Sequence, residues 1–166
     1  PERRETFLRT GPEMVEFLER KGLKYTPINF KWPDYYDNLP GGEPMSRSLV
    51  CDLFDINELG EWKDKLSLYP GVALPMGSQD FPILFTAKRT WAGKLMGMKL
   101  VWRMLKYKLL GKQMVSNGGA MQGRMLQIAL RENIPIWTDT PVEDFIIEDG
   151  RVVGVIVTRN GRKLNI

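Results

Sequence analysis

The sequence contains no histidine and only one cysteine among its 166 residues. The lack of histidine excludes Ser-His-Asp triads, Cys-His dyads and HExxH zinc sites built from this chain. The single Cys51 excludes an internal disulfide and a zinc site made of cysteines, so we expect no metal site. A chain with one cysteine is typical of a reducing compartment, and the expected location is cytoplasmic.

The sequence also lacks a long apolar run. No stretch of about 18 uncharged apolar residues occurs, so no membrane-spanning helix is expected. Hydrophobic residues make up 43% and charged residues 27% of the chain, as in globular domains. Because the chain begins at Pro1 without Met and stops in what reads as a strand, we expect a piece excised from a longer protein.

Acidic side chains are scarce in the second half of the chain. Residues 1–87 carry 10 basic and 14 acidic side chains, whereas residues 88–166 carry 14 basic and 6 acidic ones. A basic half can bind nucleic acid or an anionic membrane surface. It can also face an acidic part of the rest of the protein. Of these partners, we expect no nucleic acid.

Residues that favour the start and the end of a helix are easiest to recognise near the start of the chain. Thr10 and Glu13 have the spacing of a capping box, and Gly22 suits the position just after a helix end. We therefore expect a helix over residues 10–22, preceded by a helical turn or two over residues 2–9. The side chains expected to face inward are Phe7, Leu8, Met14, Phe17 and Leu18.

The remaining pattern predicts a mixture of helices and strands. Strands are expected at residues 23–30, 48–54 and 134–137, and helices at 56–66 after a cap at Asp55, at 88–112 and at 120–131. Residues 32–42, rich in Pro, Gly and aromatic side chains, are expected to form a loop. Asp149-Gly150 and Asn160-Gly161 are strong hairpin signals. They predict a three-stranded antiparallel meander, and the predicted fold class is α+β.

Residues 88–112 hold eight Lys or Arg and no acid. Apolar side chains recur along this segment at helical spacing, namely Trp91, Leu95, Met98, Trp102, Leu105 and Leu109. Two indoles on an apolar face with cations around it are typical of an interfacial membrane helix. The same pattern fits a helix packed on protein with its cations in solvent. We favour packing and expect both indoles to be largely buried in the intact protein. Alternatively, the stripe is exposed. It would then mediate self-association of the isolated chain or a peripheral contact with the inner face of the membrane.

Residues 118–157 resemble a known family. They run from Gly118-Gly-Ala through a helix and a Thr-Pro-Val segment to Gly150-Arg-Val-Val-Gly-Val155. This order is similar to that of the fumarate reductase/succinate dehydrogenase flavoprotein family of FAD-dependent oxidoreductases. Upstream motifs narrow the resemblance to the 3-ketosteroid Δ1-dehydrogenase branch. These motifs are Pro33-Asp-Tyr-Tyr36, Pro40-Gly-Gly42, Arg47-Ser48 and Phe54-Asp-x-x-x-Leu-Gly60. Two features depart from the family pattern: Ser46 stands where the branch usually has Gly, and the GxGxxG phosphate loop does not occur in this chain.

The resemblance implies that FAD is the cofactor of the intact protein. A hydride would move between the flavin and an apolar keto or ene substrate such as a 3-ketosteroid. Residues 1–114 would supply an active-site wall and the basic helix, which would form a hydrophobic wall beside the substrate entrance. Residues 115–166 would supply a helix and the meander of a larger FAD-binding α/β domain.

The partners implied are the remainder of its own chain and the small-molecule substrate, and the isolated chain would be inactive. Two alternatives stay open. One is a fumarate-reductase-like enzyme that acts on another substrate. The other is a basic module that binds a membrane surface or nucleic acid.

Tyr35 and Tyr36 are the candidate catalytic residues implied by the resemblance. A phenol has a reference pKa near 10, so it needs a partner or an electropositive site to handle a proton at neutral pH. One of the two would face the substrate and hydrogen-bond a tyrosine outside this chain. The alternative is that both anchor the loop, with their hydroxyls in water.

Val142 is the candidate cofactor-binding residue, because it matches the family position whose main-chain N–H and C=O contact the adenine ring. Such a contact needs only an extended strand, so the alternative is an ordinary strand residue. Arg47 could pair with a carboxylate or reach the cofactor. Asn117-Gly118-Gly119 could meet an anion at a helix N-terminus or simply cap the helix.

Overall fold

The computed structural model describes residues 2–28, 30–34, 36–44, 47–68 and 75–166. The chain divides into two compact units, residues 1–132 and residues 133–166. The sequence also predicts a functional division, with residues 1–114 forming an active-site wall and residues 115–166 belonging to the FAD-binding domain. That division stays a prediction.

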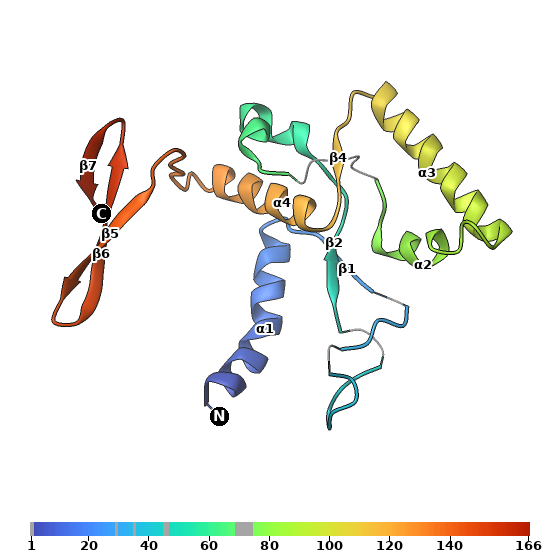
Figure 1. Ribbon diagram of the computed structural model, residues 1–166, viewed down its shortest axis with the longest axis horizontal. Coiled ribbons are helices and arrows are strands. Elements are labelled where there is room, and N and C mark those ends of the chain that lie inside the picture. The colour runs from blue at the N-terminus through green and yellow to red at the C-terminus, as the bar shows by residue number, and fades with distance from the viewer. Residues whose placement is uncertain (1, 29, 35, 45–46, 69–74) are drawn as a thin grey trace. The chain divides into compact units, whose positions relative to one another are not determined.

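The first unit combines helices with two small antiparallel sheets (Figure 1). Its elements are α1 (Glu2–Arg20), β1 (Tyr25–Pro27), β2 (Leu49–Cys51), β3 (Phe54–Asp55), η1 (Ile56–Lys65), η2 (Ser78–Asp80), α2 (Phe81–Leu84), α3 (Trp91–Leu109), β4 (Met114–Val115) and α4 (Asn117–Arg131). Strand β1 pairs with β2, and β3 pairs with β4. The predicted class, α+β, is confirmed.

Helix α1 is one helix of 19 residues, not a helix that starts at Thr10. The expected capping box is therefore wrong. Thr10 lies inside the helix, and its hydroxyl donates to Thr6 O at 2.8 Å, a bond that competes with capping. Pro12 also lies inside, although it offers no N–H to the helix. The expected end is confirmed: Gly22 has φ 106° and donates to Glu19 O at 2.9 Å, as in a Schellman motif.

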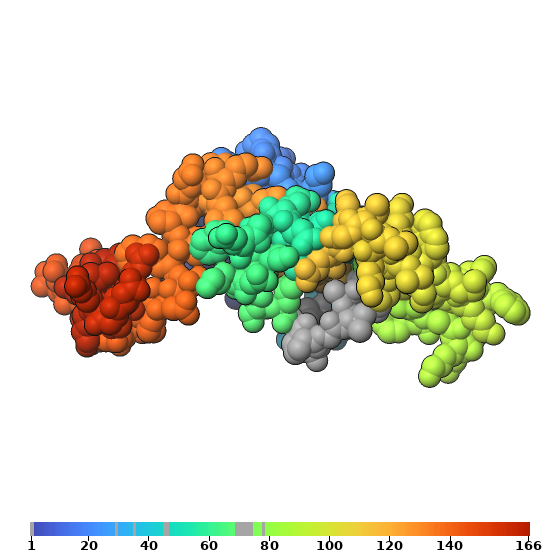
Figure 2. All heavy atoms as spheres, turned by 90° about the horizontal axis from the view of Figure 1, so that it is seen from above, coloured from blue at the N-terminus to red at the C-terminus, as the bar shows by residue number. Residues whose placement is uncertain are grey.

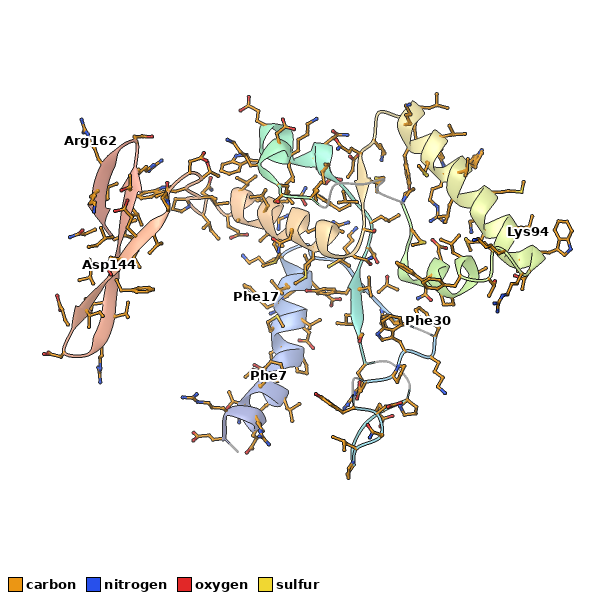
Figure 3. The ribbon with its side chains drawn as sticks, viewed as in Figure 1. Phe7, Phe17, Phe30, Lys94, Asp144 and Arg162 are labelled. Atoms are coloured by element: carbon orange, nitrogen blue, oxygen red, sulfur yellow. The ribbon has the colours of Figure 1, made fainter. Side chains whose placement is uncertain are left out.

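The inward face expected for α1 is also wrong within this chain. None of its described residues is buried. Phe7 and Leu8 are among the most exposed apolar side chains, and Met14 and Phe17 are half exposed. Figure 3 shows Phe7 and Phe17 projecting from α1 into open space. Only Leu18 reaches the core, at the C-terminal end of the helix.

The core of the first unit lies where the two small sheets meet α4. Its buried members are Leu23, Cys51, Phe54, Ile56, Leu59, Val115 and Ala120. The strand expected at 48–54 is split into β2 and β3, because β2 pairs with β1 while β3 pairs with β4. Leu53, at the break, instead accepts a hydrogen bond from Arg124 Nη2 at 3.0 Å.

The expected helix after Asp55 is confirmed as the 3-10 element η1. The Asp55 carboxylate accepts from Asn57 N at 3.2 Å and from Gln113 N at 3.0 Å, so one side chain caps η1 and ties it to the β4 region. Gly60, with φ 58° and ψ −131°, separates two helical pieces. Figure 2 shows the atoms of η1 lying directly against those of α4.

Cys51 lies in this core, and burial raises the pKa of its thiol. Because the thiolate is the reactive form, the native chain is expected to react with iodoacetamide at pH 8 at least about tenfold more slowly than the chain in urea. Mass spectrometry of quenched samples measures both rates. Equal rates would show that the core around Cys51 opens readily.

Helix α3 begins at Trp91, later than the expected start at residue 88, and Thr90 Oγ1 caps it by accepting from Gly93 N at 3.0 Å. Within this chain the apolar stripe does not face the core, and the burial of both indoles in the intact protein stays a prediction. The residues turned toward the rest of the unit are Gly93, Met96, Gly97, Leu100, Arg103, Met104 and Tyr107. Trp91 and Trp102 lie on the opposite face and are 78% and 62% exposed. A Cβ added to Gly93 would lie 2.4 Å from Ala87 N, so glycine permits the close approach to the turn after α2. No helix in the described residues is long and apolar enough to cross a membrane.

The second unit is a three-stranded antiparallel sheet in the order β5 (Val142–Glu148), β6 (Arg151–Arg159), β7 (Arg162–Asn165). Both predicted hairpins are confirmed. Asp149 and Gly150 have φ 47° and 74°, and Asn160 and Gly161 have φ 51° and 73°, as two-residue type I′ turns require. The strand expected at 134–137 is wrong. Pro135 offers no N–H, and the three strands of the unit pair with one another.

Candidate functional site

The loop that carries the candidate tyrosines is closed by Asp34. Asp34 N donates to Glu43 O at 3.1 Å, and Glu43 N donates to the Asp34 carboxylate at 3.2 Å. Arg47 Nη2 donates to the same carboxylate oxygen, and it also reaches Gly41 O at 3.4 Å. Of the two roles considered for Arg47, the structure therefore shows the pairing with a carboxylate.

These contacts fix the charge state of the loop. The hydrogen bond from Arg47, followed by that from Glu43 N, lowers the pKa of the Asp34 carboxyl. The carboxylate form is thus favoured in the closed loop. Its contribution to loop closure is fully present above the ordinary carboxyl pKa of about 4 and is lost as the pH falls through the lowered value.

The Pro40-Gly-Gly42 motif holds the backbone next to Tyr36. Leu39 N donates to Tyr36 O at 3.1 Å, and Gly42 N donates to Leu39 O at 2.9 Å. A Cβ added to Gly42 would lie 2.5 Å from Tyr36 O, so no larger residue fits without moving the tyrosine backbone. Gly41 has φ 86°, a conformation that favours glycine. The motif is therefore explained by local packing on Tyr36.

The structure places only one of the two candidate tyrosines. Tyr36 is 71% exposed at the surface of the loop. Tyr35 lies outside the described residues. The catalytic assignment of Tyr35 and Tyr36 therefore stays a prediction.

An aromatic pocket of about 350 Å³ lies next to this loop. Its walls are Ile28, Phe30, Trp32, Val50, Phe81, Phe85 and Asn117. Phe30 and Trp32 meet edge to face, with ring centroids 6.0 Å apart. Figure 3 shows the Phe30 side chain beside α2, which carries Phe81. Among the described wall residues only Asn117, the first residue of α4, is polar, so this helix start opens toward an apolar space. No sequence pattern predicts this pocket, because its walls come from four segments that are distant in the sequence.

A second cavity, of about 540 Å³, has a mixed polar and apolar lining. It lies where β1 and β2 face the inner side of α3 and includes Thr26, Asp52, Asp80 and Arg103. Arg103 Nη1 donates to Asp80 Oδ2 at 2.7 Å and to Pro75 O at 2.8 Å, and the same Asp80 oxygen accepts from Gly77 N at 3.0 Å. Arg103, which the sequence places among the solvent-exposed cations of the helix, therefore anchors α3.

Val142 has the backbone geometry that contact with an adenine ring needs. It opens β5, an outer strand of the sheet, and pairs with Val157. Thr158 N donates to Pro141 O at 3.3 Å, which makes Val142–Val157 a pair without mutual hydrogen bonds. The N–H and C=O of Val142 therefore point away from β6, toward the free edge.

The bulge after Val142 is held by side chains. The register shifts between Val142 and Asp144, so Glu143 is the extra residue. The Glu143 carboxylate accepts from Thr158 Oγ1 at 2.6 Å and pairs with Lys163 Nζ at 2.9 Å. These two contacts lower the pKa of Glu143.

The described residues contain no group of three or more His, Cys, Asp or Glu that could hold a metal ion. An adenine-containing cofactor, in contrast, fits the free edge at Val142, which offers one donor and one acceptor. The chain alone is expected to bind FAD weakly, because it lacks the GxGxxG loop that contacts the pyrophosphate. Titration of the 166-residue chain, followed by flavin fluorescence, measures this. A dissociation constant below about 1 µM would refute the expectation.

Comparison with known proteins gives the family. The family model described as "FAD binding domain" matches residues 1–166. The 3-oxosteroid 1-dehydrogenase of Mycolicibacterium smegmatis is 37% identical over 94% of this chain and 28% of its own length. That of Comamonas testosteroni is 27% identical over 96% of this chain and 30% of its length.

A solved structure matches as well. It is the crystal structure of 3-ketosteroid Δ1-dehydrogenase from Sterolibacterium denitrificans in complex with 1,4-androstadiene-3,17-dione. The TM-score is 0.81 at 30% identity, over 96% of this chain and 31% of that one. The chain thus spans about three tenths of the length of these relatives. Since the family model matches it from end to end, the chain belongs to the FAD-binding-domain family of flavoproteins.

Proposed function

We propose that this chain is part of an FAD-dependent dehydrogenase that introduces a double bond next to the ketone of a 3-oxosteroid. The observation that carries the proposal is the aromatic pocket beside the tyrosine loop, in a chain whose relatives are 3-oxosteroid 1-dehydrogenases. Of the seven wall residues that the structure describes, six are apolar, and four of these are aromatic. Such walls suit a rigid, apolar ring system.

The chemistry divides between cofactor and chain. FAD, when bound, supplies the hydride acceptor. The reaction also releases a proton from the carbon next to the ketone, and the chain must provide a group to take it. We assign this role to Tyr35 or Tyr36, with the other tyrosine packing in the loop. Asp34, Arg47 and Gly42 keep the loop closed around Tyr36.

The edge of β5 would bind the cofactor. The N–H and C=O of Val142 point away from β6 and would offer a donor and an acceptor to an adenine edge. The remaining contacts to FAD, and the rest of the steroid site, would come from the remainder of the protein. The isolated chain is therefore expected to be inactive.

A fumarate-reductase-like activity is the main alternative. A dicarboxylate needs cations or other strong donors, and among the described walls of the aromatic pocket only Asn117 offers a side-chain donor. The chain also provides no histidine. Both observations favour the steroid substrate.

Steady-state assays of the full-length gene product with a redox dye distinguish the two. We expect turnover with androst-4-ene-3,17-dione as electron donor and none with succinate. Product analysis should show the 1,4-diene. Activity with succinate or fumarate alone would refute the proposal.

A further inference from the structure

The outer face of α3 is an apolar stripe bordered by lysines on both sides. With 3.6 residues per turn, the stripe residues fall along one line of the helix. Those residues are Trp91, Leu95, Met98, Trp102, Leu105 and Leu109, and all six are exposed. Lys99 and Lys106 project from one border of the stripe and Lys94 and Lys108 from the other.

This face is separate from the contacts that hold the helix. Figure 1 shows α2 lying against one side of α3, and the packed residues Gly93, Leu100 and Arg103 turn toward the rest of the first unit. The helix therefore has two apolar faces. The inner one packs on its own chain, and the outer one is uncovered by the described residues.

We propose that the outer face of α3 docks on an anionic lipid membrane surface. The first argument is charge. No Asp or Glu occurs anywhere from residue 81 to residue 131, whereas ten Lys or Arg do. A negatively charged surface would meet cations on both borders of the stripe and no opposing carboxylate.

The second argument is the placement of the indoles. Lys94 Nζ lies 4.7 Å from the ring centroid of Trp91, and Lys106 Nζ lies 5.4 Å from that of Trp102. Lys94 is labelled on α3 in Figure 3. An indole that carries an ammonium group at its side suits the boundary between headgroups and acyl chains, where tryptophan and lysine are both favoured.

The same features disfavour a protein cover. Lysine is depleted in the cores of protein interfaces, yet four lysines border this stripe. Two copies of α3 placed face to face would bring their lysines together without a carboxylate from residues 81–131 to pair them. A lipid surface explains the apolar stripe and its cationic borders together.

The test is co-sedimentation of the full-length, flavin-loaded gene product with two kinds of vesicle, phosphatidylcholine alone and phosphatidylcholine mixed with phosphatidylglycerol. We expect binding to the mixed vesicles that weakens as salt is raised. Trp91→Ala combined with Trp102→Ala should weaken this binding at least about tenfold. Lys94→Glu combined with Lys106→Glu should weaken it at least as much.

Matched controls come from the second unit. Trp137→Ala also removes an exposed indole beside a cation, since Arg159 lies 4.1 Å from that ring. Arg151→Glu with Arg162→Glu changes the net charge by the same amount as the lysine pair. Both controls should bind as the wild type does, and flavin absorbance should be unchanged in all variants.

Three results would overturn the proposal. They are equal binding to uncharged vesicles, no binding to either vesicle, and unchanged binding in the double tryptophan variant. Sedimentation velocity would then show what covers the outer face of α3 instead of lipid. A dimer that the double tryptophan variant converts to a monomer would assign the face to a second copy, and a wild-type monomer that binds no vesicle would assign it to the rest of the protein.

Discussion

Phenylalanine in place of the proton-accepting tyrosine is expected to lower turnover by roughly 10² or more, the usual scale for an acid–base group. Tyr36→Phe and Tyr35→Phe each keep the ring and remove only the hydroxyl. One of them should show this loss in the full-length protein, with steroid affinity and flavin absorbance nearly unchanged. Steady-state kinetics with a dye acceptor measures the effect.

Tyr25→Phe is the matched control. Tyr25 packs against the core cluster from β1, and burial raises the pKa of its phenol, so it has no reason to exchange a proton at neutral pH. Its variant should retain turnover. If neither Tyr35→Phe nor Tyr36→Phe loses even about tenfold, both tyrosines are loop anchors and the assignment is wrong.

The largest stability loss is expected from Phe54→Ala, at about 3–5 kcal/mol of unfolding free energy. Phe54 is 1% exposed and lies under α4, where a Cβ added to Gly123 would come within 2.6 Å of its ring. The guanidinium of Arg124 lies 5.0 Å from the ring centroid. Removal of the ring would leave a cavity beneath both residues. Urea unfolding of the full-length protein, followed by tryptophan fluorescence, measures the loss.

Phe145→Ala is the control for this experiment, because it makes the same change on an exposed strand position. Its effect should stay within about 0.5 kcal/mol. Equal effects of the two variants would contradict the placement of Phe54 at the centre of the core.

Local signals in the sequence predicted the parts of the fold that depend on local conformation. Asp149-Gly150 and Asn160-Gly161 predicted both hairpins, because a type I′ turn needs two consecutive residues with positive φ. Asp55 predicted the start of η1 because its carboxylate can accept from a main-chain N–H of the first turn, here that of Asn57. Thr10 and Glu13 misled, since their capping-box spacing lies here inside a longer helix.

The remaining parts of the fold depend on which distant segments pair or pack with one another. The segment 48–54 is one apolar run in sequence, yet it forms two strands that pair with different segments. Helical spacing identified the stripe on α3 but could not tell which of its two apolar faces packs on the chain. Gly93 decides that, because its lack of a side chain lets the helix lie against Thr86 and Ala87 in the turn after α2.

In the candidate site, too, single residues could be recognised from the sequence, whereas their contacts with distant segments could not. Arg47 was recognised as a partner for a carboxylate, but only the fold identifies Asp34 as that partner. The aromatic pocket is assembled from residues 28–32, 50, 81–85 and 117, and no spacing within any one segment reveals it. Val142 was assigned from family resemblance, and its main-chain direction follows from the register of β5.

Anaerobic reduction of the bound flavin tests the central proposal most directly. The full-length protein would be mixed with androst-4-ene-3,17-dione in the absence of any other electron acceptor, and the flavin absorbance recorded. The proposed function predicts that the oxidised flavin band disappears while the 1,4-diene forms in an amount equal to the flavin. An oxidised flavin band that persists with this steroid would contradict the proposal. If fumarate then reoxidises the chemically reduced flavin of the same protein, the fumarate-reductase-like alternative is established.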